Sequence, residues 1–194
     1  MKKALIAAAM VVASGSAMAA DGGNLDFNGL VQSATCKTSV VVGGTQTVSS
    51  DGIITLATAT VPDISSTVNA TSPGALPKEF RIGVNCSGSE TKAHLTMGSV
   101  NYANANGTLD NNMNITVNGL AAAQGVNIAV HEVKTGGAVT QVKMGDASDI
   151  HDLLLDANGD GEYVFDASYV KASDSATVTV GHVTTNGLYT IVYE

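Results

Sequence analysis

Hydrophobic and polar residues alternate with a period of two along much of this chain. Neighbouring side chains of an extended chain point to opposite faces, so each alternating segment predicts a β-strand with one buried face. Eight segments have this pattern: residues 53–61, 79–84, 93–97, 114–117, 126–133, 163–170, 176–180 and 188–193. No long stretch has the 3.6-residue period of a helix, apart from a short turn near residues 150–155. The pattern therefore indicates an all-β protein.

Turn-forming residues separate the predicted strands. They include the pairs Gly43-Gly44, Asp51-Gly52, Asn106-Gly107, Gly136-Gly137 and Asn186-Gly187. Many short strands divided by such turns are typical of an antiparallel β-sandwich of the immunoglobulin type. We find no linker or shift in composition along the chain, so we expect one sandwich domain over residues 34–194.

The N-terminal residues have the pattern of a secretory signal peptide. Lys2 and Lys3 precede an apolar run over residues 4–13, and small residues at 17–19 suit a cleavage site. We therefore expect residues 1–19 to be removed and the remaining 175 residues to be exported. The run is too short to span a membrane and no second long apolar segment follows, so no direct membrane insertion is predicted.

Charge and cysteines narrow the possible partners and chemistry. Without Lys2 and Lys3, seven basic residues face 17 acidic ones, a net charge of −10, which argues against nucleic acid as a partner. Cys36 and Cys86 are the two cysteines. In an oxidising compartment we expect them to form a disulfide, the alternative being two buried thiols. The four scattered histidines add no recognisable zinc spacing, so no metal or other cofactor is predicted.

A further alternating segment, residues 23–31, precedes the first cysteine. Leu25, Phe27, Gly29 and Val31 share one face of the extended chain, and Asn24, Asp26 and Asn28 share the other. A terminal strand is ordered only when something holds it. The pattern fits either an ordinary first strand of the sandwich or a strand that inserts into another molecule.

Four motifs together resemble those of pilins, the subunits of chaperone-usher fimbriae in Gram-negative bacteria. The first is the alternating segment with Gly29, followed by Cys36; the second is the strand from Phe80 to Cys86. The third is an aromatic strand over residues 163–169. The fourth is at the C-terminus, where Gly181 is fourteenth from the end and Tyr193 is penultimate. These motifs span most of the chain, although residues 98–149 carry none.

This resemblance implies a structural, non-enzymatic role. Pilins of this family have an immunoglobulin-like sandwich without its last strand, and an N-terminal donor strand of the next subunit fills the groove. Here the donor strand would be Leu25, Phe27, Gly29 and Val31, within an extension over residues 20–33. The groove and the strands read by the chaperone would include Gly181, Tyr189, Ile191 and Tyr193.

The resemblance also implies partners and a location. Pilins polymerise with copies of themselves or with sibling pilins, after a periplasmic assembly chaperone delivers them to an outer-membrane usher. The expected location is thus a fimbrium on the cell surface, reached through the periplasm, with a role in adhesion. The alternative is a secreted monomeric β-sandwich that binds carbohydrate, although a chain without Trp and with eight Tyr and Phe offers few rings for sugar stacking.

One motif resembles a calcium site. Asp156, Asn158 and Asp160 with Gly161 match the start of an EF-hand loop, but position twelve is Ala167, where the loop needs a bidentate Glu. Asp, Asn and Gly also suit tight turns. We therefore interpret the segment as a turn between two strands.

Overall fold

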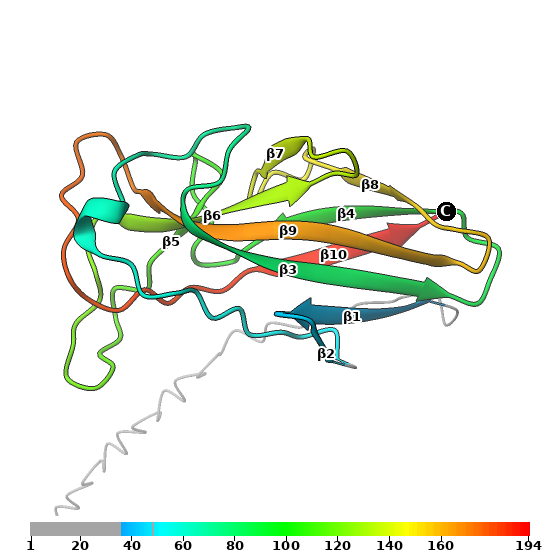
Figure 1. Cartoon of the computed structure of the whole chain (residues 1–194), viewed down its shortest axis with the longest axis horizontal. Helices are drawn as coiled ribbons and strands as arrows, with labels where there is room; N and C mark the ends of the chain where they lie inside the picture. Colours follow the sequence, from blue (N-terminus) through cyan, green and yellow to red (C-terminus); the bar gives the residue numbers. More distant parts are fainter. Residues whose placement is uncertain (1–35, 48) are drawn as a thin grey trace, which may run out of the picture. The chain divides into compact units, whose positions relative to one another are not determined.

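The structure is a computed structural model that describes residues 36–47 and 49–194. Its strands form two antiparallel sheets (Figure 1). The predictions for residues 1–35, which are the signal peptide, the extension over residues 20–33 and the donor strand, lie outside the described residues.

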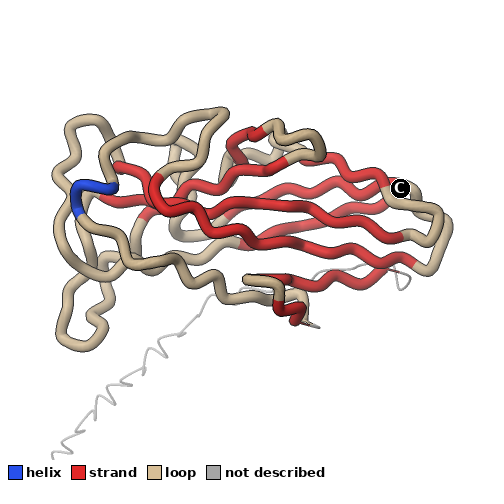
Figure 2. Tube along the Cα trace, in the orientation of Figure 1, coloured by secondary structure: helices blue, strands red, loops and turns tan. Residues whose placement is uncertain are grey.

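The larger sheet contains seven strands in the order β2-β1-β3-β9-β6-β5, with β7 also paired to β6. Their bounds are β1 Cys36–Val42, β2 Thr45–Thr47, β3 Ala75–Cys86, β5 Leu109–Asp110, β6 Val126–Val133, β7 Val139–Val142 and β9 Asp160–Lys171. The smaller sheet has the order β10-β4-β8, with bounds β10 Leu188–Tyr193, β4 Lys92–Gly98 and β8 His151–Leu154. Within the described residues the only helix is the 3-10 turn η1, Val61–Asp63 (Figure 2).

Side chains from both sheets form one hydrophobic core. Phe80 of β3 stacks on Phe165 of β9, with ring centroids 5.3 Å apart. Leu95 of β4 and Ile191 of β10 join the same cluster from the smaller sheet. A polar link crosses the core as well, because the Tyr163 hydroxyl of β9 donates to the carbonyl oxygen of Ala93 in β4 at 2.8 Å. This packing of two antiparallel sheets confirms the predicted all-β, immunoglobulin-like sandwich.

Five of the eight predicted strands are confirmed. The predictions for residues 126–133 and 188–193 coincide with β6 and β10, and the other three lie within β3, β4 and β9. The burial of β3 and β4 alternates along the strand, as a sheet with one face on the core requires. In contrast, seven of the eight residues of β6 are buried, because β6 lies inside the larger sheet and is covered on both faces.

Residues 114–117 and 176–180 are not strands, and the prediction for both is wrong. Val117 instead pairs with Leu120 across a tight turn, in which Asn118 and Gly119 have positive φ. Residues 150–155 are also not helical, since they contain strand β8. The tight turn replaced a strand at residues 114–117, no partner strand pairs with residues 176–180 among the described residues, and pairing with β4 made residues 151–154 a strand.

The strand prediction for residues 53–61 is wrong in a different way. The segment has alternating exposure, with Ile54 and Leu56 half-buried against the core and Ile53 87% exposed. It is not a strand, however, because it has no ladder of backbone hydrogen bonds with any described residue. The sequence pattern therefore predicted which side chains face the core, while the predicted strand is wrong.

Candidate functional site

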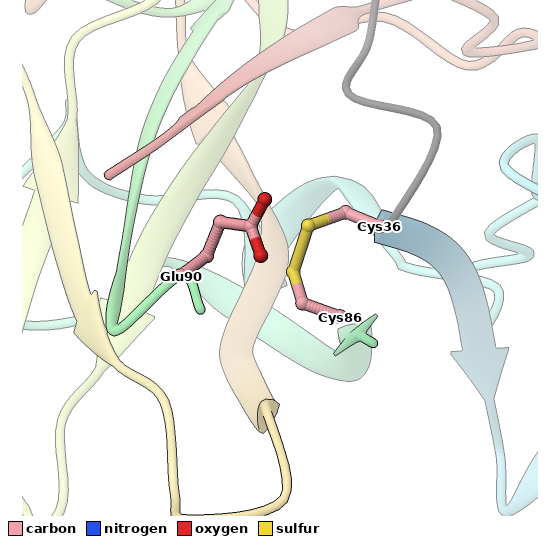
Figure 3. Close-up of side chains that lie close together, drawn as sticks. All are labelled: Cys36, Cys86 and Glu90. Atoms are coloured by element: carbon pink, nitrogen blue, oxygen red, sulfur yellow. A yellow bond between two sulfur atoms is a disulfide. The ribbon is translucent and has the colours of Figure 1, made fainter. Parts of the chain in front are cut away.

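The predicted disulfide between Cys36 and Cys86 is present. The two residues are direct partners in the antiparallel register of β1 and β3, with Cα atoms 3.9 Å apart. Figure 3 shows the Glu90 carboxylate beside the two sulfur atoms. Because both sulfurs are bonded to each other, neither is the thiolate that would bind a metal. At this end of the sandwich the disulfide therefore links β1 to β3 covalently.

The turn after β8 supports the strand that carries Cys86. Gly159 has a φ of +80°, and its carbonyl oxygen accepts a hydrogen bond from the Cys86 amide at 2.9 Å. A Cβ atom there would collide with the Cys86 carbonyl oxygen, so only glycine fits. The Asp156 carboxylate accepts backbone hydrogen bonds from Asn158 and Asp160, which lower its pKa, the bond from Asp160 contributing most. The interpretation of this segment as a turn is confirmed.

Strand β10 forms one edge of the smaller sheet. It pairs with β4 from Leu188 to Tyr193, and no described residue pairs with its other side. Ile191 is 4% exposed and points into the core, whereas Val192 is 59% exposed on the outer face. Among the described residues, the edge therefore combines unpaired backbone groups with side chains that belong to the core, as an acceptor of another strand requires.

Two tyrosines on the inner face of β10 are half-buried. The Tyr189 hydroxyl donates to the Ser50 carbonyl oxygen at 2.7 Å, which ties β10 to the segment that follows β2. The Tyr193 hydroxyl is buried and has no hydrogen-bond partner among the described residues. Burial raises the pKa of both phenols. Of the predicted groove residues, the structure thus brings Tyr189, Ile191 and Tyr193 together on one strand.

Gly181 lies away from these three residues. It forms a bend seven residues before β10 and belongs to no strand, which corrects its expected place on a groove strand. A Cβ atom at this position would lie 2.5 Å from the Ala121 carbonyl oxygen and 2.6 Å from the Ala122 carbonyl carbon. Close approach of two backbones therefore explains why residue 181 is glycine. Its recognition by a chaperone stays a prediction.

The segment at residues 49–57 is a part of the site that the sequence did not identify. Two tyrosine hydroxyls hold it, Tyr189 through Ser50 and Tyr169 through the Ala57 carbonyl oxygen at 3.2 Å. Its half-buried Ile54 and Leu56 pack on the same core as Ile191. The alternating pattern was a usable signal, but it could not tell which strand the segment lies beside.

A polar hollow of about 340 Å³ lies at the loops around residues 101–114 and 123–127. Its two buried amides already have partners within the chain. Asn111 donates to the carbonyl oxygens of Ala123 and His182, and Asn127 donates to Thr108 and Asp110. These bonds fix the loops, and they give no specific support to the carbohydrate-binding alternative.

Comparisons with known proteins identify the fold. None of the known protein-family models matches the chain. No curated protein sequence matches it either. Among solved structures, a chain from a chaperone-usher pilus, whose structure reveals the molecular basis of rod uncoiling, is similar with a TM-score of 0.53 and 19% identity. That comparison covers 90% of this chain and 97% of the other. The P pilus rod subunit PapA is similar with a TM-score of 0.50 and 16% identity, over 74% of this chain and 93% of PapA.

At these identities the likeness establishes a shared fold. The chain therefore has the fold of chaperone-usher pilus rod subunits over nearly the whole length of those subunits. In addition, no helix among the described residues is long and apolar enough to cross a membrane.

Proposed function

We propose that this protein is a structural subunit of a chaperone-usher pilus and that it polymerises by donor-strand exchange. The observation that carries the proposal is the edge of β10, which has no partner strand among the described residues and contributes Ile191 to the core. The shared fold with pilus rod subunits supports the same role. We expect no enzymatic activity.

An edge of this kind is unstable in isolation. Unpaired backbone groups and apolar side chains favour aggregation unless another strand covers them. The segment at residues 23–31 has the alternation that such a strand needs, with Leu25, Phe27 and Val31 on one face. It precedes β1, so each subunit would give one strand and receive one. A contact in which two different surfaces meet extends into a filament and does not close into a dimer.

The need to cover the β10 edge also determines the partners that we expect. A periplasmic chaperone would cover the β10 edge before assembly, and an outer-membrane usher would exchange it for the donor strand of the next subunit. Tyr189, Ile191 and Tyr193 would contact whichever strand occupies the edge. The protein would then reach the cell surface through the periplasm and be part of an adhesive fimbrium.

The test compares two leucine substitutions in the proposed donor strand. Gly29 lies on the apolar face, where a missing side chain suggests a shallow place in the acceptor. Gly29→Leu should overpack this place at a cost of roughly 1 to 3 kcal/mol. Asn28→Leu adds the same side chain to the opposite face and is the matched control. We would measure chaperone-bound subunit in the periplasm and filaments on the cell surface.

We expect Gly29→Leu to abolish or strongly reduce filaments while the chaperone complex accumulates normally. Asn28→Leu should assemble at close to the wild-type level. Loss of both filaments and chaperone complex in Gly29→Leu would mean that residues 23–31 form an internal strand of the subunit. Normal filaments in both variants would refute the donor role of this face.

A further inference from the structure

Two histidines of the smaller sheet each lie between two carboxylates. His151 of β8 is 4% exposed; its Nδ1 lies 2.7 Å from Glu132 Oε2 and its Nε2 lies 3.1 Å from Asp149 Oδ2. Glu132 belongs to β6, so this contact joins the smaller sheet to the larger one. Glu132 is itself 5% exposed. The first histidine is therefore a buried link between the two sheets.

The second histidine is on the outer face of the same sheet. His94 of β4 has Nδ1 2.6 Å from Asp152 Oδ1 and Nε2 3.3 Å from Glu194 Oε2. Asp152 lies on β8, directly opposite His94 in the register, and Glu194 is the C-terminal residue after β10. His94 thus contacts a carboxylate on each side of its own strand.

Strand β8 is held on both faces by these contacts. His151 and Asp152 are neighbours in the chain, so their side chains point to opposite faces of the strand. One face is tied to β6 through Glu132, and the other is tied through His94 towards the end of β10. Backbone bonds between Glu194 and Lys92 complete the attachment of the C-terminus.

Hydrogen-bonding capacity indicates the protonation state of both rings. A carboxylate is only an acceptor, whereas a neutral imidazole has one donor and one acceptor nitrogen. A ring that faces carboxylates at both nitrogens must carry two protons to satisfy both contacts, as at His151. At His94, Nδ1 is hydrogen-bonded to Asp152, and Nε2 lies at ion-pair distance from Glu194 without forming a hydrogen bond with a described residue. A neutral ring would turn a lone pair towards one carboxylate and lose that contact.

We propose that the smaller sheet is held together by two protonated histidines, and that deprotonation of His151 and His94 loosens β8 and the β10 edge. The proposal is independent of the pilus role, because it concerns only contacts within this chain. It predicts that stability of the smaller sheet depends on pH near and above neutrality.

The surrounding charges favour this assignment. Burial lowers the pKa of His151, but the hydrogen bonds to Glu132 and Asp149 outweigh this effect and raise it overall. The Lys134 ammonium, 3.6 Å from the same Glu132 oxygen, is a positive charge that acts in the opposite direction. The Tyr163 hydroxyl of β9, which donates to Ala93, also lies 3.2 Å from the His151 carbonyl oxygen.

For His94, the hydrogen bond to Asp152 and then the contact with Glu194 raise the pKa, against a smaller effect of burial. Lys92 is on the same face of β4, two residues earlier.

The sign of the pH dependence follows from these directions. Both pKa values are higher in the folded than in the unfolded chain, where histidine has a pKa of about 6.5. The stabilisation is therefore complete below pH of about 6.5 and is lost as the pH rises through the folded-state pKa values. Each unit of difference in pKa corresponds to a tenfold change in the folding equilibrium constant.

The first experiment measures protonation directly. The folded full-length chain, labelled with 15N in histidine, would be titrated by NMR from pH 5.5 to 9. We expect two of the four imidazoles, assigned by substitution to His94 and His151, to remain doubly protonated well above pH 6.5. A neutral His151 ring at pH 6.5 would overturn the proposal. This measurement uses the wild-type chain, so it does not depend on whether variants fold.

The second experiment measures the consequence for stability. Urea unfolding would be followed across the same pH range for wild type, His151→Gln and His94→Gln. The control is His182→Gln, because His182 has no carboxylate at ion-pair distance among the described residues. We expect the wild type and the control to lose stability above pH 6.5 and each test variant to show a smaller loss. Identical pH profiles in all four proteins would overturn the proposal.

Hydrogen exchange locates the effect. Amide protection in the β10–β4 and β4–β8 ladders should fall between pH 6.5 and 9, after correction for the intrinsic exchange rate. The β3–β9 ladder of the larger sheet is the internal reference: its protection should fall by no more than the loss of global stability measured in urea, whereas protection in the smaller sheet should fall further. A uniform fall in both sheets would show global unfolding and would contradict local loosening.

Discussion

Reduction of the Cys36–Cys86 disulfide should lower the free energy of unfolding by about 4 kcal/mol. The bond joins residues 50 positions apart, and closing a loop of this length in the unfolded chain costs about 14 cal/mol/K of entropy in the chain-entropy model. At 25 °C this corresponds to about 4 kcal/mol. Since whole domains have stabilities of 5 to 15 kcal/mol, the loss would be a large part of the total.

The contacts between β1 and β3 indicate that reduction of the disulfide changes the folded state little. Cys36 and Cys86 face each other in the register of β1 and β3, and six further pairs hold the same two strands together. The Cys86 amide also keeps its bond to Gly159. Reduction should therefore leave the strands in place, so that most of the effect arises in the unfolded chain.

Urea unfolding of the oxidised protein and of the reduced protein measures this difference in the free energy of unfolding. Thiol alkylation checks that the disulfide is fully reduced. With a slope of about 2 kcal/mol/M, a loss of about 4 kcal/mol lowers the midpoint by about 2 M. The double variant Cys36→Ala/Cys86→Ala is the control, because it keeps the strands but has no bond to reduce. Its midpoint should be close to that of the reduced wild type and should not respond to reductant.

A midpoint that moves by less than about 0.5 M on complete reduction would refute the reasoning. It would mean that the unfolded chain is already compact in the region between the two cysteines, so that the bond removes little entropy. Two free thiols in protein isolated from the periplasm would contradict the expectation more directly. Mass measurement after thiol alkylation detects them.

Two further predictions concern single residues near β10. Gly181→Ala should lower the free energy of unfolding by roughly 1 to 3 kcal/mol, because its Cβ atom would press on the backbone at Ala121 and Ala122; thermal unfolding checks this, and an unchanged midpoint would contradict the close contact. Tyr193→Phe should leave the free energy of unfolding unchanged or raise it by about 1 kcal/mol, since the lost hydroxyl is buried without a partner among the described residues. A loss of more than about 1 kcal/mol in urea unfolding would show that the hydroxyl is bonded.

The sequence predicted the long strands best. The alternating segments at residues 79–84, 93–97 and 163–170 lie within β3, β4 and β9, whose inner side chains build the core. Their periodicity was sufficient because each contributes several side chains to one buried face. The disulfide could also be predicted, since export and a single pair of cysteines leave few alternatives.

Short strands could not be predicted in the same way. Strand β8 has four residues, His151–Leu154, and only one of them is buried. Its strand conformation depends on pairing with β4, a segment about 60 residues earlier in the chain. Conversely, residues 176–180 alternate in sequence but pair with no strand. Partners distant in sequence decide such cases, and periodicity does not report them.

The contacts between histidines and carboxylates could not be predicted from the sequence for the same reason. The four histidines are scattered in the sequence and show no recognisable spacing. His94 and Asp152 are 58 positions apart, and Glu132 and His151 are 19 apart, so no local motif joins them. Only the register of β4 and β8 and the packing of β6 against the smaller sheet bring them together.

The disulfide and the non-covalent contacts of the smaller sheet hold different parts of the sandwich. The disulfide fixes β1 to β3 within the larger sheet, whereas the smaller sheet is joined to it by the core, by the Tyr163 hydroxyl and by the Glu132–His151 pair. The edge proposed to accept a donor strand belongs to the smaller sheet, which has no covalent link to the larger one among the described residues. If the β10 edge is covered first by a chaperone and then by a donor strand, as we propose, the absence of a disulfide between the two sheets leaves this edge free of covalent restraint. The disulfide can thus provide global stability without restricting the edge that we propose as the acceptor of a donor strand.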